Sequence, residues 1–314
     1  MIVLKLDHFT LISRKPLKIT NVGSIKPIFL HEIEDITIHV YNNFLSVLML
    51  DINTYYKWME KEDDYFRYYS QEQKQKVLEV KKQYEELDTK EKLSISFYDL
   101  LMYDELLICS FIEAFNFFFE EEVDFVVNGN EITDAQFSFI TYNKIDTPQN
   151  IKLRNGNEYS AIKTNRELIG IINGSNFKDV VDIILQRNSV QREEEITAED
   201  LTKVKNKNKV MQLMEKMKKG QKQLDKTREK KREEKGVASD TELANIISCV
   251  AAKNHNGINM INIWDMTIYN LYEQFKLIRE NNIHDAETLS VFVWGDKSNK
   301  FDIDGWFKEK FKVK

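Results

Sequence analysis

The residues that could carry out chemistry are few and far apart in this chain of 314 residues. Its two cysteines, Cys109 and Cys249, each lie inside an apolar helical pattern, and neither has a neighbouring base that would activate a thiol. We interpret both as buried thiols of a reducing compartment, not as a disulfide or a nucleophile. The five histidines do not pair with the cysteines at the short spacing of a structural zinc site, so no metal centre is predicted.

An acidic run from Asp296 to Asp304 is the next candidate for chemistry. A calcium-binding EF-hand loop needs glycine at its sixth position, and phenylalanine stands there whether the loop is counted from Asp296 or from Asp302. The glycine-rich turns that bind nucleotide phosphates are also missing from the sequence. We therefore expect a protein that is not an enzyme and that needs no cofactor.

The composition predicts a helical protein with a sizeable core. Proline (3 residues) and glycine (10 residues) are scarce, and 42% of the residues are hydrophobic. The N-terminus lacks the pattern of a secretory signal, and no run approaches the roughly 18 uncharged apolar residues of a membrane span. We expect the protein to act in the cytosol and not in a membrane.

Residues 1–190 are predicted to form an α+β lobe. Strands are expected at Lys18–Val22 and at Ile36–Val40. Two hairpins are expected as well: one pairs Val123–Val127 with Ile132–Ile140 around the turn Asn128-Gly129, and the other spans Lys152–Ile162 around the turn Asn155-Gly156. Helices are expected over the apolar positions from Phe44 to Met59, over 95–119 and from Ser175 to Asn188. The 95–119 helix is apolar nearly all round, so we place it at the centre of a core. The polar region 60–93 is interpreted as a solvated helix or a mobile insertion.

Residues 191–237 are predicted to be a basic helical linker. Residues 201–235 hold 12 Lys and 2 Arg against 4 Glu and 1 Asp, a net charge of +9, so the rest of the chain carries −15 of the total of −6. Val210, Met214, Met217 and Leu224 follow the spacing of a two-heptad seam, which could support self-association through 210–224. The segment is open to three interpretations: a solvated arm, a surface that docks on an acidic protein, or a nucleic-acid contact. Lysine predominates and no aromatic is interleaved, a composition that suits diffuse electrostatics better than base recognition.

Residues 238–314 are predicted to form an aromatic, mostly helical lobe. One helix follows Asp240, with Leu243, Ile246, Ile247 and Val250 on its face. A second helix is expected after Asn262, and Leu289–Trp294 alternates like a strand. The aromatic residues either build the core or bind a partner, because tryptophan is frequent at binding hot spots. The candidate partner-binding residues, taken with the methionines of the linker, are Trp264, Tyr269, Tyr272, Phe275, Trp294, Trp306, Phe307, Met211, Met214 and Met217.

Several of these segments resemble one group of known proteins. The run from Asn262 to Phe275, then Val293-Trp-Gly-Asp296 and Trp306-Phe-Lys308, is similar to the C-terminal region of proteins encoded among the tail genes of phages and phage-like particles of Gram-positive bacteria. Asn176–Asn188 and Phe117–Val123 are similar to segments of the same proteins. The resemblance implies a tail or baseplate assembly protein that binds other tail proteins, as a chaperone or as a structural component. It implies no cofactor and assigns no role to a single residue.

Together these observations predict an α+β, mostly helical protein of two lobes joined by a charged helical arm, with β-hairpins in the N-terminal lobe. Its partners would be other phage tail or baseplate proteins. It would act in the host cytoplasm or be incorporated into the virion tail. The alternative function is that of a nucleic-acid-associated protein that uses the basic 201–235 segment.

Overall fold

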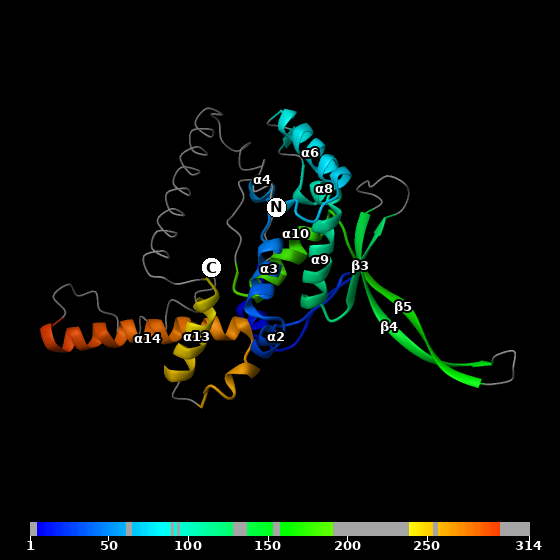
Figure 1. The fold of residues 1–314 in the computed structure, drawn as a ribbon. Coiled ribbons are helices and arrows are strands. Elements are labelled where there is room, and N and C mark those ends of the chain that lie inside the picture. Colours follow the sequence, from blue (N-terminus) through cyan, green and yellow to red (C-terminus); the bar gives the residue numbers. More distant parts are fainter. Residues whose placement is uncertain are drawn as a thin grey trace. The chain divides into compact units, whose positions relative to one another are not determined.

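The computed structural model describes residues 5–60, 65–88, 91–92, 95–127, 137–152, 158–190, 239–253 and 257–295. Helices predominate and two antiparallel sheets accompany them, which confirms the predicted α+β class (Figure 1). The chain forms two compact units, one made of residues 1–27 and 36–223, the other of residues 28–35 and 224–314. The predicted basic linker, 191–237, lies outside the described residues.

The first unit contains most of the helices. They are α1 (His8–Ile12), α3 (Ile38–Leu48), α4 (Ile52–Met59), α6 (Gln71–Glu86), α8 (Phe97–Leu101), α9 (Glu105–Phe118) and α10 (Phe177–Arg187). Side-chain caps set several of the N-terminal ends. Asp51, Ser70 and Ser96 form reciprocal capping boxes at α4, α6 and α8, and Asp104 caps α9.

Two antiparallel sheets belong to the same unit. A short hairpin joins β1 (Leu17–Ile19) to β2 (Gly23–Ile25), and β3 (Glu122–Val127), β4 (Phe137–Lys152) and β5 (Glu158–Ile172) form a three-stranded meander. The register pairs Lys152 with Glu158, as the second predicted hairpin requires. In the first hairpin β3 does pair with the next strand, but Val127 lies opposite Phe137, so the pairing begins later than the predicted start at Ile132. The turn residues Asn128-Gly129 and Asn155-Gly156 lie outside the described residues.

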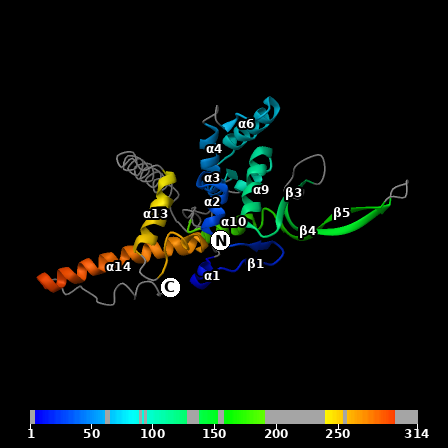
Figure 2. The ribbon, with the colours of Figure 1, turned by 60° about the horizontal axis from the view of Figure 1, so that its bottom comes forward.

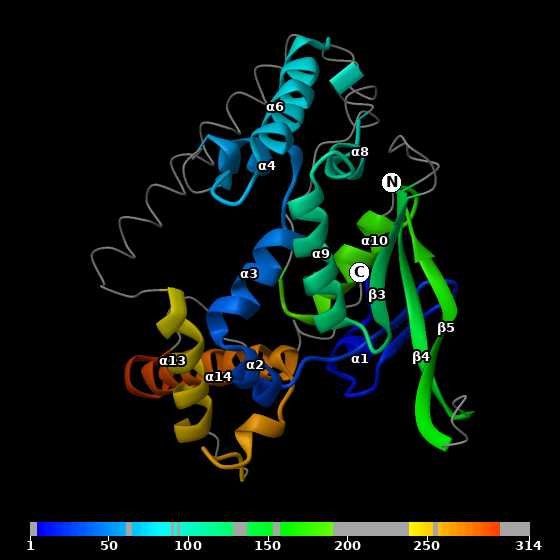
Figure 3. The same ribbon diagram turned by 45° about the vertical axis from the view of Figure 1, so that its right-hand side comes forward.

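α9 lies beside the meander (Figure 3), and the two are joined by a phenylalanine-rich core. The fully buried Phe111 and Phe115 of α9 contact Phe139 of β4, with ring centroids 6.4 and 5.2 Å apart. Phe177, the first residue of α10, stacks on the same Phe139 ring at 6.3 Å. The prediction that the 95–119 segment lies at the centre of a core is therefore confirmed.

The structure corrects several predicted elements of this unit. Ile36–Val40 is not a strand: α3 begins at Ile38, because Tyr41, Val47 and Leu48 continue a helical pattern that buries them. The predicted single helices split at acidic caps, Asp51 between α3 and α4 and Asp104 between α8 and α9. Within 60–93, residues 71–86 form a helix in which Val77 is the buried residue and Tyr84 packs on Tyr56 of α4 (ring centroids 5.3 Å apart); most of its other side chains are polar, as expected for a solvated helix. Cys109 is exposed and Cys249, in the second unit, is half-buried, so neither is the buried thiol that was predicted.

The second unit joins two distant parts of the sequence. It contains the 28–35 segment with most of α2 (Leu30–Ile36), then α13 (Ser239–Lys253), the 3₁₀ turn η1 (Ile263–Asp265) and α14 (Ile268–Trp294). Phe29 and Thr267 form an antiparallel bridge: the Leu30 amide donates to the Met266 carbonyl (3.0 Å), and the Ile268 amide donates to the Ile28 carbonyl (2.8 Å).

The core of this unit is mostly aliphatic. Its buried side chains come from all four segments: Ile28, Leu30, Ile33, Leu243, Ile246, Ile247, Val250, Ile263, Ile268 and Leu271. The predicted apolar face of the 240–253 helix is confirmed. Residues 28–35, which the sequence pattern places in the N-terminal lobe, supply part of the core of the C-terminal one.

Candidate partner-binding surface

A loop between α13 and η1 holds two large apolar side chains in solvent. Met260 is 53% exposed and Ile261 is 87% exposed. Two asparagines bracket them: the Asn259 carboxamide oxygen accepts from the amides of Ile261 (2.8 Å) and Asn262 (3.2 Å), and the Asn262 carboxamide oxygen accepts from the Asn259 amide (2.8 Å). These reciprocal bonds restrain the backbone over 259–262, which lowers the entropy cost of a contact made through this segment.

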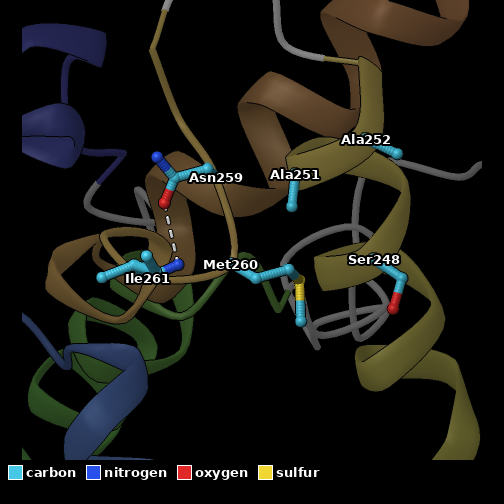
Figure 4. Close-up of a pocket in the computed structure, with 6 residues that line it drawn as sticks. All are labelled: Ser248, Ala251, Ala252, Asn259, Met260 and Ile261. Carbon is cyan, nitrogen blue, oxygen red and sulfur yellow. Dashed lines mark hydrogen bonds between the residues drawn. The ribbon is translucent and has the colours of Figure 1, made fainter.

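The loop and α13 together form a shallow, open pocket (Figure 4). Its volume is ≈ 600 Å³, and it is lined by Ser248, Ala251, Ala252, Asn259, Met260 and Ile261. Met260 reaches across the pocket towards α13, where the side chains are small. Among the described residues its lining is uncharged and mostly apolar, which suits contact with an apolar side chain.

The end of α14 is the second apolar surface of this unit. Leu289, Phe292, Val293 and Trp294 are 61–82% exposed. The sequence pattern predicted a strand over 289–294, but the helix continues to Trp294 and ends at Gly295, which has a positive φ of 73°. The strand prediction is wrong because a six-residue alternation cannot compete with a long helix that is already nucleated and capped at Thr267.

The structure separates the predicted aromatic residues by role. Tyr269 is buried in the core, where burial and the charge of Glu273 raise its pKa to about 12. Tyr272 and Phe275 are half-buried on α14. Trp264 is half-buried as well, and its indole N–H donates to the Met260 carbonyl (3.1 Å), so it supports the exposed loop. Of the five candidates that the structure describes, Trp294 alone is largely exposed (73%).

The other predicted partner-binding residues lie outside the described residues. They are Trp306, Phe307, Met211, Met214 and Met217. The heptad-spaced segment 210–224 and the acidic run from Asp296 to Asp304 also lie outside the described residues. Sequence reasoning overlooked Met260 and Ile261. The signal that could have indicated them is the Asn259-Met-Ile-Asn262 pattern, in which two turn-forming residues enclose two apolar ones.

Sequence reasoning also overlooked a buried polar cluster in the first unit. The Asp104 carboxylate is fully buried and accepts hydrogen bonds from the hydroxyls of Tyr55 (2.8 Å), Tyr65 (2.7 Å) and Tyr69 (2.7 Å). It also accepts from the Leu107 amide (3.1 Å) as the cap of α9. Burial, and then the Asp104 charge, raise the pKa of all three phenols. Because each phenol hydroxyl is committed to the carboxylate, we interpret the cluster as a structural clamp that joins α4, residues 65–69 and α9.

Other chemistry is sparse in the described part of the chain. Cys109 and Cys249 are both free thiols. Partial desolvation, together with Glu113 and Glu105, raises the pKa of the Cys109 thiol and makes it a poor nucleophile. No group of three or more metal-ligating side chains occurs among the described residues. Within those same ranges, no helix has the length and apolar content needed to cross a membrane.

Comparison with known proteins relates the second unit to a phage domain. Residues 230–310 match the family model described as the YomV second domain. The match includes α13, the Met260–Ile261 loop and α14, and it associates this part of the chain with phage proteins. Searches of curated proteins and of solved structures give no match.

Proposed function

We propose that this protein is a phage tail or baseplate assembly protein that binds other tail proteins through the Met260–Ile261 loop of its second unit. The observation that carries the proposal is the 87% exposure of Ile261 in a loop held by reciprocal asparagine bonds. A large apolar side chain that a hydrogen-bonded backbone turn presents to water is typical of a binding surface, since local folding gains nothing from its exposure.

Two further observations support this function. The loop lies inside the range that matches the YomV second domain, and the tail-protein resemblance includes Asn262–Phe275, which follows it directly. The pocket between the loop and α13 is apolar and open, so it suits a protruding aliphatic or aromatic side chain of a partner. The role is one of binding and not of catalysis, and it is exercised in the host cytoplasm or in the virion tail.

The test is a tagged pull-down of the full chain from nuclease-treated producing cells, read by mass spectrometry beside the proteome of purified particles. We expect tail proteins in the pull-down. Their presence with this protein absent from particles indicates a chaperone, whereas a fixed stoichiometry in particles indicates a structural component. Capture of no tail protein, or binding of duplex DNA at low salt with no protein partner, overturns the proposal.

Matched variants connect the result to the loop. Ile261→Asp should weaken capture at least about tenfold, because burying one isoleucine side chain contributes roughly 1.5–3 kcal/mol. Ile283→Asp makes the same change at another exposed position of the second unit, 50% exposed on α14, and should leave capture unchanged. Equal capture by wild type and Ile261→Asp would move the binding surface elsewhere.

A further inference from the structure

The C-terminal end of α14 carries large apolar side chains that are exposed to solvent. α14 extends past α13 towards its C-terminal end (Figure 2). Ile268 and Leu271 at its start are buried, whereas Leu289 and Phe292 near its end are 66% and 82% exposed. A helix that begins in a core and continues with large exposed apolar side chains is typical of an association surface.

The apolar residues follow a coiled-coil spacing. Alternating steps of three and four residues from Ile268 lead through Leu271, Phe275, Ile278, Asn282, Asp285, Leu289 and Phe292. Another stripe of the helix is half-buried: Leu277, Glu280, His284, Thr288 and Val291. At 3.6 residues per turn this stripe lies roughly 130° around the helix from the seam. Within the seam itself, Phe275 and Ile278 are half-buried, whereas Asn282, Asp285, Leu289 and Phe292 are exposed.

The seam is complementary to itself in one direction. When two copies run antiparallel, Phe275 of one lies opposite Phe292 of the other, and Ile278 lies opposite Leu289. The same register brings Asn282 opposite Asp285, so the two polar seam positions meet each other and not an apolar side chain. Because every pairing is reciprocal, the contact has two-fold symmetry and closes on itself.

The charges along this stretch of α14 favour the same direction. Its first half holds Lys276, Arg279 and Glu280, a net charge of +1, and its second half holds Asp285 and Glu287, a net charge of −2. An antiparallel pair brings the basic half of one helix against the acidic half of the other. A parallel pair would place like charges together, which is unfavourable.

We propose that two copies of this chain associate through an antiparallel pairing of α14 over residues 275–294. The pairing buries four apolar layers around a central Asn282–Asp285 contact, over about 30 Å of helix. It is independent of the Met260–Ile261 loop, so one chain in the dimer can still present that loop to a tail protein. The dimer would carry two copies of the loop and gain avidity for a partner that repeats.

Light scattering of the full chain after size exclusion tests the association. We expect a concentration-dependent approach to twice the single-chain mass of 37.2 kDa. Leu289→Glu with Phe292→Glu should give the single-chain mass at every concentration, and both side chains are exposed enough for folding to be unaffected. Ile283→Glu, on the same helix but off the seam, should keep the dimer. A wild-type chain that stays at the single-chain mass, or equal effects of the seam and control variants, overturns the proposal.

Disulfide trapping tests the direction. In a chain with Cys109→Ser and Cys249→Ala, the pair Ile278→Cys and Leu289→Cys should form an intermolecular disulfide under mild oxidation. Leu289→Cys alone should not form one, because an antiparallel pair places the two copies of residue 289 far apart. Efficient trapping by Leu289→Cys alone indicates a parallel pair and refutes the register. Loss of the dimer with tail-protein capture intact, or the reverse, separates this proposal from the proposed function.

Discussion

Replacing Asp104 by alanine tests the interpretation of the buried tyrosine cluster. The carboxylate is fully buried and accepts four hydrogen bonds, three from phenol hydroxyls and one from the Leu107 amide. Asp104→Ala removes every one of these acceptors at once. The three hydroxyls are then left in a site that the fold has closed around a carboxylate.

The magnitude follows from the number of stranded donors. Each buried donor left without an acceptor costs about 1–3 kcal/mol, and the loss of the α9 cap adds about 1 kcal/mol. Hydroxyl rotation, entry of water and the removed cost of burying the carboxylate offset part of this sum. We therefore expect Asp104→Ala to lower the free energy of unfolding by about 3–5 kcal/mol, a large fraction of the stability of a typical domain.

Urea denaturation followed by circular dichroism measures the effect. Asp7→Ala is a matched control, because Asp7 also caps a helix and bonds the Thr10 amide and hydroxyl, but in an exposed position. The control should lose far less stability. A loss in Asp104→Ala no greater than in Asp7→Ala would refute the view that the cluster is a clamp. A melting curve for Tyr65→Phe intermediate between wild type and Asp104→Ala would support it.

Two other predictions concern the first unit. The pKa values of Tyr55, Tyr65 and Tyr69 are raised in the folded protein, so their contribution to stability is complete below the unfolded value of about 10 and is lost as the pH rises above it. The free energy of unfolding should fall above about pH 10. Absorbance at 295 nm should show that these phenols ionise only when the helical circular dichroism signal is lost. Full ionisation of all three phenols in a protein that is still native would contradict this prediction. Gly170→Ala would bring a Cβ to 2.4 Å from the Asn21 backbone, so we expect a loss of about 1–3 kcal/mol, while the exposed Glu167→Ala on the same strand should be nearly neutral.

Several elements were predictable because their causes lie within a few residues. The phenylalanine-rich 105–118 helix, the hairpin between β4 and β5 and the apolar face of α13 each follow from a local periodicity or from turn residues. The end of α10 at Arg187, with Asn188 as its cap, was predicted for the same reason. Where two local patterns competed, the short alternation misled: at 36–40 the packing of α3 decided the outcome, and at 289–294 the continuation of the capped helix α14 did.

The sequence by itself therefore determined the class of the fold, most of its elements and the absence of a recognisable catalytic motif. Only the tertiary structure decided that Ile28 and Leu30 bond to the chain around residue 267, and that three tyrosines 35 to 49 residues away in the chain converge on Asp104. It also decided which apolar residues remain exposed, so that Ile261 became a candidate contact while Tyr269 joined the core. The physical reason is that burial and long-range hydrogen bonds depend on which segments meet in space, and local periodicity carries no information about that.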